Sequence, residues 1–207
     1  MPVKKRPEKR KHYVRGDEAN IYLVRRGGFR GVERVSHSRE GQDLRLRYLR
    51  HRIAHILHPE HFFEMRPPRK KGNDLVLRSR FLRPDKLYRD ALESFYRTRE
   101  RFSVFQEGSV LERHASRTED RRTREAAERI RASGINVNTN FMNIMYRTKS
   151  KMPIFAEVED VDPKQIRRSL DGLGVHGGKR RTVMRLLRVY EGRMEALRKQ
   201  RGLPSPS

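Results

Sequence analysis

The chain has no cysteine, about half as many acidic as basic residues and no long apolar run. Without cysteine it forms no disulfide bond, and thiolate metal sites and cysteine nucleophiles are excluded. No stretch approaches the ~18 consecutive apolar residues of a membrane-spanning helix. The N-terminus also lacks the apolar core of a signal peptide. We therefore expect a soluble protein of the cytoplasm.

The apolar content is low, at 34% of 207 residues, but it is periodic. Apolar side chains recur at helical or strand spacing along most of the chain, which favours a lean globular fold over wholesale disorder. The length suits one domain, or one domain with tails.

The balance of charge is strongly positive. Lys and Arg number 50 against 26 Asp and Glu, so the net charge is +24 and the isoelectric point is near 11.2. Such a field attracts polyanions, of which nucleic acid is the commonest inside cells. Acidic proteins and anionic membranes are alternative partners, and GC-rich coding alone could produce the arginine excess. We expect a nucleic acid or a nucleoprotein particle as partner, bound through the basic N-terminal arm and the C-terminal helix. The alternative for the helix is that its apolar stripe simply docks on the domain.

The pattern divides the chain into four segments. Residues 1–15 are basic and have no apolar period, so we expect a disordered arm. Residues 16–83 predict a small sheet with one helix, and residues 84–176 a mainly helical region. Residues 177–207 predict a basic amphipathic helix and tail. The expected class is α+β with a small antiparallel sheet.

Turn and periodicity signals predict the individual elements. Two short β-prone runs flank Gly27-Gly28 and indicate a hairpin. The remaining predictions are a helix at 38–57, strands at 61–66 and 74–82 around a charged turn, helices from Pro84 and over 118–132, two strands within 143–160, and a helix after Pro163.

Two motifs at first suggest ligand sites. His51 and His55 stand at i, i+4, a spacing that suits zinc on one helix face. The alternative is surface or cap histidines near a helix end, and the sequence does not favour zinc. GLGVHG (172–177) has the spacing of a dinucleotide fingerprint but lacks a preceding strand. We interpret it, with the GGKRR that overlaps its end, as a flexible basic linker.

A neutral, amide-rich segment, NVNTNFMNIM (136–145), precedes an acidic cluster, EVEDVD (157–162). Alternation along a strand would place Glu157 and Glu159 on one face. Oxygen ligands beside an amide-rich loop suit Mg²⁺. The alternative is that the acidic cluster balances nearby arginines.

Several segments together resemble the protein-kinase-like fold, in particular small atypical kinases and aminoglycoside phosphotransferases. RGDEANIYLV (15–24) is similar to the glycine loop and second strand, and GVERV (31–35) to the third strand. The helix at 38–57 would be the helix of the N-lobe, and 74–82 the strand before the hinge. The resemblance covers about residues 15–163. It implies a degenerate kinase-like fold with an antiparallel N-lobe sheet and a reduced helical C-lobe.

The same resemblance implies a set of site residues. The asparagine-rich segment takes the place of the catalytic loop: Asn136 replaces its histidine, Asn138 replaces the catalytic aspartate, and Asn143 matches the metal-binding asparagine. Glu157 stands where the metal-binding aspartate belongs. The resemblance thus implies ATP and Mg²⁺ as cofactors, with Asn143 and Glu157 holding the metal.

Two more positions come from the N-lobe resemblance. Gly16 falls in the glycine loop, and Arg34 stands at or near the phosphate-binding lysine. A planar guanidinium is not equivalent to an ammonium. An asparagine at position 138 also cannot accept a proton as the aspartate would.

These departures predict a pseudokinase or weak nucleotide-binding protein that acts on or with a polyanionic partner. A working ATP-dependent phosphotransferase stays open if Glu157 or Asp160 replaces the missing acid. The alternative function is a non-enzymatic, basic nucleic-acid-binding protein, or a structural protein of a ribonucleoprotein or phage particle. In that case the asparagine loop makes only turn hydrogen bonds.

Overall fold

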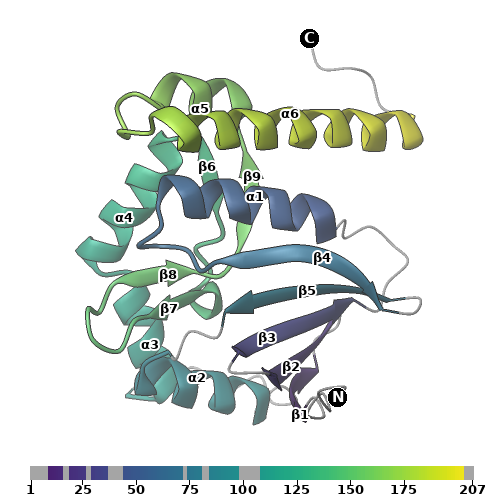
Figure 1. The fold of residues 1–207 in the computed structure, drawn as a ribbon. Coiled ribbons are helices and arrows are strands. Elements are labelled where there is room, and N and C mark those ends of the chain that lie inside the picture. The colour runs from purple at the N-terminus through teal and green to yellow at the C-terminus, as the bar shows by residue number, and fades with distance from the viewer. Residues whose placement is uncertain are drawn as a thin grey trace, which may run out of the picture. The chain divides into compact units, whose positions relative to one another are not determined.

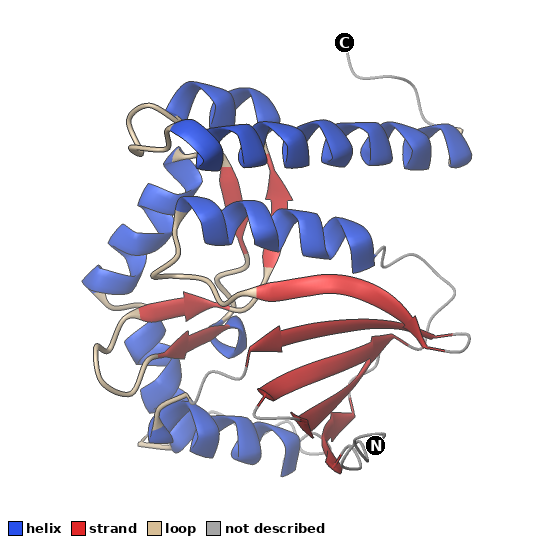
Figure 2. Ribbon diagram, viewed as in Figure 1, coloured by secondary structure: helices blue, strands red, loops and turns tan. Residues whose placement is uncertain are grey.

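The computed structural model describes residues 9–15, 19–26, 29–36, 44–71, 74–80, 84–97 and 108–202. Within them the protein is α+β, with helices and antiparallel strand pairs (Figures 1 and 2). The chain divides into two compact units. The first comprises Met1–Ile53, Phe63–Leu82 and Leu186–Ser207, and the second comprises Ala54–Phe62 and Arg83–Arg185.

The first unit contains a five-stranded antiparallel sheet in the order β1-β2-β3-β5-β4. Its strands are β1 (Lys9–Arg15), β2 (Ala19–Arg26), β3 (Phe29–Ser36), β4 (Met65–Lys71) and β5 (Asp74–Arg80). Strands β2 and β3 form the pair that the hairpin pattern predicted. Because no crossover helix separates β1, β2 and β3, this part of the sheet is built from local connections.

Two strands differ from the sequence expectation. Lys9–Arg15, expected in a disordered arm, forms edge strand β1 against β2. Met65–Lys71, expected mostly as a charged turn, forms the opposite edge strand, β4. Its register shifts between Arg66 and Arg69, around two prolines. Edge strands tolerate prolines and lysines because one side of their backbone stays unpaired, so hydropathy alone did not reveal them.

Helix α1 (Leu44–Leu57) lies in the chain between β3 and β4. It ends before Pro59, as predicted, and residues 38–43 of the expected helix lie outside the described residues. Leu44 of α1 packs with Met65 of β4 and Leu77 of β5 in one buried cluster, which Tyr48 and Phe63 border. The helix is thereby held to the edge half of the sheet. Burying such side chains stabilises the fold by about 1.5–3 kcal/mol each.

The second unit contains two short antiparallel strand pairs. β6 (Ile135–Val137) pairs with β9 (Val158–Val161), and β7 (Ile144–Tyr146) pairs with β8 (Pro153–Phe155). The two pairs are nested along the chain. The connection from β6 to β7 therefore lies close to the connection from β8 to β9, and these two connections carry the asparagine loop and Glu157.

Helices surround these strands in the second unit. They are α2 (Lys86–Arg97), α3 (Val110–Thr118), α4 (Arg121–Ala132) and α5 (Pro163–Ser169). The helix expected at 118–132 is α4, which begins at Arg121 because the side chain of Asp120 accepts a hydrogen bond from the backbone N–H of Thr123 and caps it. The fully buried apolar side chains of this unit include Ile130, Ile135, Ile144, Ile154, Phe155 and Ile166.

The last helix, α6 (Gly177–Gln200), includes GGKRR, which the sequence suggested was a flexible linker. The helix has an apolar face on which Val183, Leu187 and Tyr190 are buried. This burial accounts for the helical state of the segment, since a packed amphipathic face outweighs the poor helix propensity of two glycines. In the described part of the chain, no helix is long and apolar enough to cross a membrane.

Candidate functional site

The asparagine loop is shaped by its own amide side chains. Oδ1 of Asn138 accepts a hydrogen bond from the backbone N–H of Asn140 (2.9 Å). Oδ1 of Asn140 accepts one in turn from Met142 (3.0 Å), at the start of the 3-10 turn η1 (Phe141–Asn143). Asparagine side chains commonly stabilise turns in this way. Two successive turns therefore carry the chain from β6 to Asn143.

One carboxylate joins the two ends of this loop. Nδ2 of Asn138 lies 3.2 Å from Oε2 of Glu157, and Nδ2 of Asn143 lies 3.3 Å from the same oxygen. Two backbone hydrogen bonds hold the asparagine loop against the segment that carries Glu157. The N–H of Asn138 donates to the carbonyl of Glu157 (3.2 Å), and the N–H of Ala156 donates to the carbonyl of Asn143 (2.8 Å). The structure thus brings together three residues that the sequence singled out.

Glu159 and Asp162 of EVEDVD have other hydrogen-bond partners. Glu159 is exposed and accepts a hydrogen bond from Asn136 (3.1 Å). Asp162 caps α5 through the backbone N–H groups of Lys164 and Gln165. Among the described residues, no group of three or more His, Asp or Glu could hold a metal ion. A site at Glu157 would therefore have one carboxylate ligand.

The ligands that Mg²⁺ prefers are present at this point. The ion binds through one or two carboxylates, several waters and substrate phosphates, and amide oxygens are hard ligands of the same kind. Asn143 now presents Nδ2 to Glu157. Rotation of its amide by 180° would present Oδ1 instead, on the side where the carboxylate lies. The donor set consequently fits a magnesium ion shared with phosphate.

Two buried donors support the 3-10 turn. Nε2 of His114, on α3, lies 2.9 Å from the carbonyl oxygen of Phe141, and the hydroxyl of Tyr88, on α2, donates to the carbonyl of Met142 (3.1 Å). Burial lowers the pKa of His114, so the ring is neutral at pH 7 and carries its proton on Nε2. The sequence analysis missed both residues. Only long-range contacts reveal them, since each lies more than 25 residues from its acceptor.

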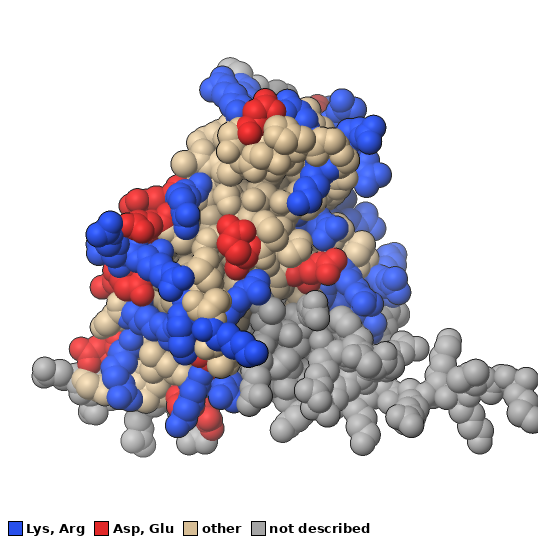
Figure 3. Space-filling view, turned by 60° about the vertical axis from the view of Figure 1, so that its left-hand side comes forward, with Lys and Arg blue, Asp and Glu red and all other residues tan. Residues whose placement is uncertain are grey.

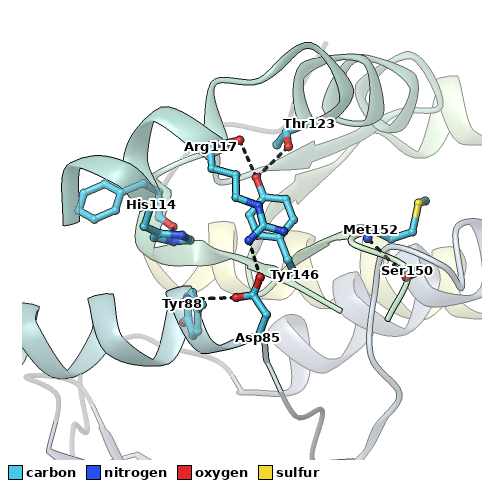
Figure 4. Close-up of polar contacts among 9 residues, drawn as sticks. Asp85, Tyr88, His114, Arg117, Thr123, Tyr146, Ser150 and Met152 are labelled. Atoms are coloured by element: carbon cyan, nitrogen blue, oxygen red, sulfur yellow. Dashed lines mark hydrogen bonds and ion pairs between the residues drawn. The ribbon is translucent and has the colours of Figure 1, made fainter. Parts of the chain in front are cut away.

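A polar group beside this turn connects α2, α3, α4 and β7 (Figure 4). The guanidinium of Arg117 forms an ion pair with Asp85 and lies 3.6 Å from the ring centroid of Tyr146. The hydroxyl of Tyr146 is 2.8 Å from Oγ1 of Thr123. Asp85 also accepts a hydrogen bond from the backbone N–H of Tyr88, at the start of α2 (3.1 Å). Every side chain here has a partner, so the group is a structural one.

The pKa values in this group follow from burial and charge. Burial would raise the pKa of Asp85, but the hydrogen bond and charge of Arg117 and the N–H of Tyr88 hold it below its ordinary value. Burial raises the pKa of Tyr146. At neutral pH the group therefore contains one carboxylate, one guanidinium and a neutral phenol.

The histidines near the end of α1 bind protein atoms. Nδ1 of His55 lies 3.0 Å from the carbonyl oxygen of Phe62, and Nδ1 of His61 lies 2.9 Å from that of Pro153. Nε2 of His58 lies 2.8 Å from Oγ of Ser133. The hydroxyl of Ser133 donates to a helix carbonyl (2.6 Å) and must therefore accept from His58. These contacts tie the segment after α1 to α4 and β8.

His58 should make stability depend on pH. Burial lowers the pKa of His58 to about 4, against 6.5 for the free side chain. The unfolded chain therefore takes up a proton at a higher pH than the folded protein does. The free energy of unfolding should be level above pH ~7 and fall by about 1.4 kcal/mol per unit, at most, as the pH drops from ~6.5 toward ~4. Urea unfolding of wild type and His58→Gln across this range tests it, and equal pH slopes would contradict it.

Two predicted ligand positions are not placed. Gly16 and the side chain of Arg34 lie outside the described residues. The backbone of Arg34 belongs to β3, opposite Leu77 of β5. Its neighbour Glu33 is fully buried, and Oε2 of Glu33 lies 3.5 Å from a guanidinium nitrogen of Arg78. The sequence analysis did not identify this cross-strand ion pair.

Comparison with known proteins adds no assignment. No protein-family model matches the chain, and no curated protein matches it in sequence.

Proposed function

We propose that this protein is a kinase-like pseudokinase that binds a magnesium–nucleotide complex at Asn143 and Glu157 and transfers no phosphoryl group. The observation that carries the proposal is the convergence of two amides on one carboxylate. Asn138, Asn143 and Glu157 come from two different connections, yet both amides lie within 3.3 Å of the same oxygen.

The spacing of these residues supports the proposal. In the kinase catalytic loop five positions separate the catalytic aspartate from the metal-binding asparagine, and the second metal ligand follows on a later strand connection. Asn138 and Asn143 are five positions apart, and Glu157 follows β8. The first unit has an antiparallel sheet in which α1 follows the third strand, an order that agrees with the one the resemblance implies. This agreement in order supports a kinase-like fold.

The proposed roles follow from the side chains. Oδ1 of Asn143 and the carboxylate of Glu157 would hold the ion, which when bound neutralises charge on the nucleotide phosphates. Asn138 donates to Glu157 and has no basic atom, so it removes no proton from a substrate hydroxyl. Binding without transfer is the expected activity.

The test is a thermal shift with Mg-ATP, on wild type and Glu157→Gln. A ligand at 100 times its Kd adds about 2.7 kcal/mol of stability. Gln at 157 can still accept both amide hydrogen bonds but lacks the charge, so the shift should disappear while the fold persists. Glu159→Gln, two positions along, is the matched control and should keep the shift. ATP with EDTA should give no shift in any variant.

A wild type that does not respond to millimolar Mg-ATP would contradict the proposal. It would favour the alternative, a basic nucleic-acid-binding or nucleoprotein-particle protein in which the loop is structural. The net charge of +24 and the turn bonds within the loop support that alternative.

A further inference from the structure

Helix α6 carries a row of arginines with no acidic partner. Arg181, Arg185 and Arg188 stand at i, i+4 and i+7, so they lie along one side of the helix over about 10 Å. All three are exposed, and none forms an ion pair with a described residue. Other basic residues of this helix do have partners: Arg180 pairs with Asp171, and Lys199 pairs with Glu195.

This arrangement has an energetic cost. Like charges at i, i+4 destabilise a helix by about 0.2–0.5 kcal/mol per pair. The row is nevertheless held in place, because Val183, Leu187 and Tyr190 bury the opposite side of α6. An anion bound along the row would remove the repulsion. The space-filling view also shows basic side chains in large excess over acidic ones on the face it presents (Figure 3).

The chemistry of the row indicates phosphate. A guanidinium presents a planar fork of donors that matches phosphate oxygens in bidentate fashion, better than an ammonium does. A membrane-binding helix would need an exposed apolar face, and among the described residues the only large hydrophobic side chain that is exposed is Val189, at 52%. A protein partner would need aromatic or apolar anchors at the same place.

The burial of Tyr190 favours a duplex over a single strand as the nucleic acid that α6 binds. Proteins that bind single strands stack the bases on exposed aromatic side chains. The one aromatic residue of α6, Tyr190, is 3% exposed and therefore provides no stacking surface. Contacts to backbone phosphates alone suit a duplex, whose bases are already paired and stacked.

We propose that Arg181, Arg185 and Arg188 bind the phosphodiester backbone of a nucleic-acid duplex, without regard to its sequence. This inference does not depend on the nucleotide site. If the protein has both the nucleotide site and the duplex-binding row, it binds a duplex through α6 whether or not Mg-ATP is present.

The test is fluorescence anisotropy of full-length protein with labelled RNA and DNA duplexes of about 20 base pairs, titrated with salt. The row variant is R181Q/R185Q/R188Q, in which Gln keeps a similar helix propensity. The matched control, R113Q/R124Q/R168Q, removes the same charge from exposed positions on three other helices. Circular dichroism checks that both variants are folded.

The row variant should bind about tenfold more weakly or worse, and its salt slope should fall by about 2–3, since each phosphate contact contributes about 0.9. The control should stay within about threefold of wild type. The RNA and DNA arms tell which duplex is bound. Equal losses in both variants, tighter binding to single strands, or no binding by wild type would overturn the proposal. Preference for phosphatidylserine vesicles or polyglutamate would do the same.

Discussion

Asp85→Ala should lower the free energy of unfolding by about 3–5 kcal/mol. The substitution removes one partner of a buried ion pair and leaves the charge of Arg117 without its counter-ion, which is the costly way to break such a pair. It also removes the side-chain acceptor for the N–H of Tyr88 at the start of α2, a capping loss of about 1 kcal/mol. Urea unfolding at neutral pH measures the change.

Two controls separate these contributions. Asp85→Asn can still cap α2 but carries no charge, so it should recover about 1 kcal/mol relative to alanine. Glu125→Ala removes the partner of Arg121 in an exposed ion pair and should leave the free energy of unfolding nearly unchanged. If Asp85→Ala were as mild as Glu125→Ala, the ion pair would have no role in holding α2 and α3 to β7.

Gly134→Ala should cost about 2–5 kcal/mol. Gly134 leads from α4 into β6 with φ +91, a conformation that strains an alanine by about 1–2 kcal/mol. A Cβ there would also lie 3.0 Å from the carbonyl oxygen of Asp162 and 3.0 Å from Ile166, and crowding of this kind costs about 1–3 kcal/mol. Thermal or urea unfolding measures the loss.

Gly174→Ala isolates the strain from the crowding. Gly174 has φ +64, and nothing lies within 4 Å of the Cβ that alanine would add. Its expected cost is the backbone strain alone, about 1–2 kcal/mol. Equal losses at the two glycines would show that the approach of α5 to Gly134 contributes nothing.

Most helices and the central strands were predictable from the sequence, but the two edge strands of the sheet, β1 and β4, were not. Alternation and turn residues predicted the pairing of β2 with β3, and helical spacing predicted α1. Strand β4 was missed because two prolines and four basic residues follow its Met65, a composition typical of a turn. Such a strand forms because β5 offers backbone partners, which is a tertiary effect.

The candidate site was likewise predictable only in part. Asn138, Asn143 and Glu157 were identified through the resemblance to the kinase-like fold, and the structure brings them together. The residues that hold the turn, Tyr88 and His114, were not, since nothing in local sequence pairs them with the loop. A hydrogen bond between segments so far apart in the chain produces no periodic pattern in the sequence.

The distances around Glu157 constrain what can stand at positions 138 and 143. At 3.2–3.3 Å an amide donates a hydrogen bond, but an aspartate there would face Glu157 as a second carboxylate. Two carboxylates this close share one proton or require a cation between them. Asparagine has nearly the same shape as aspartate but carries no charge, so it needs neither a shared proton nor a cation beside Glu157. An aspartate at position 138 would therefore form an acid pair with Glu157, in which binding of a proton competes with binding of a metal ion.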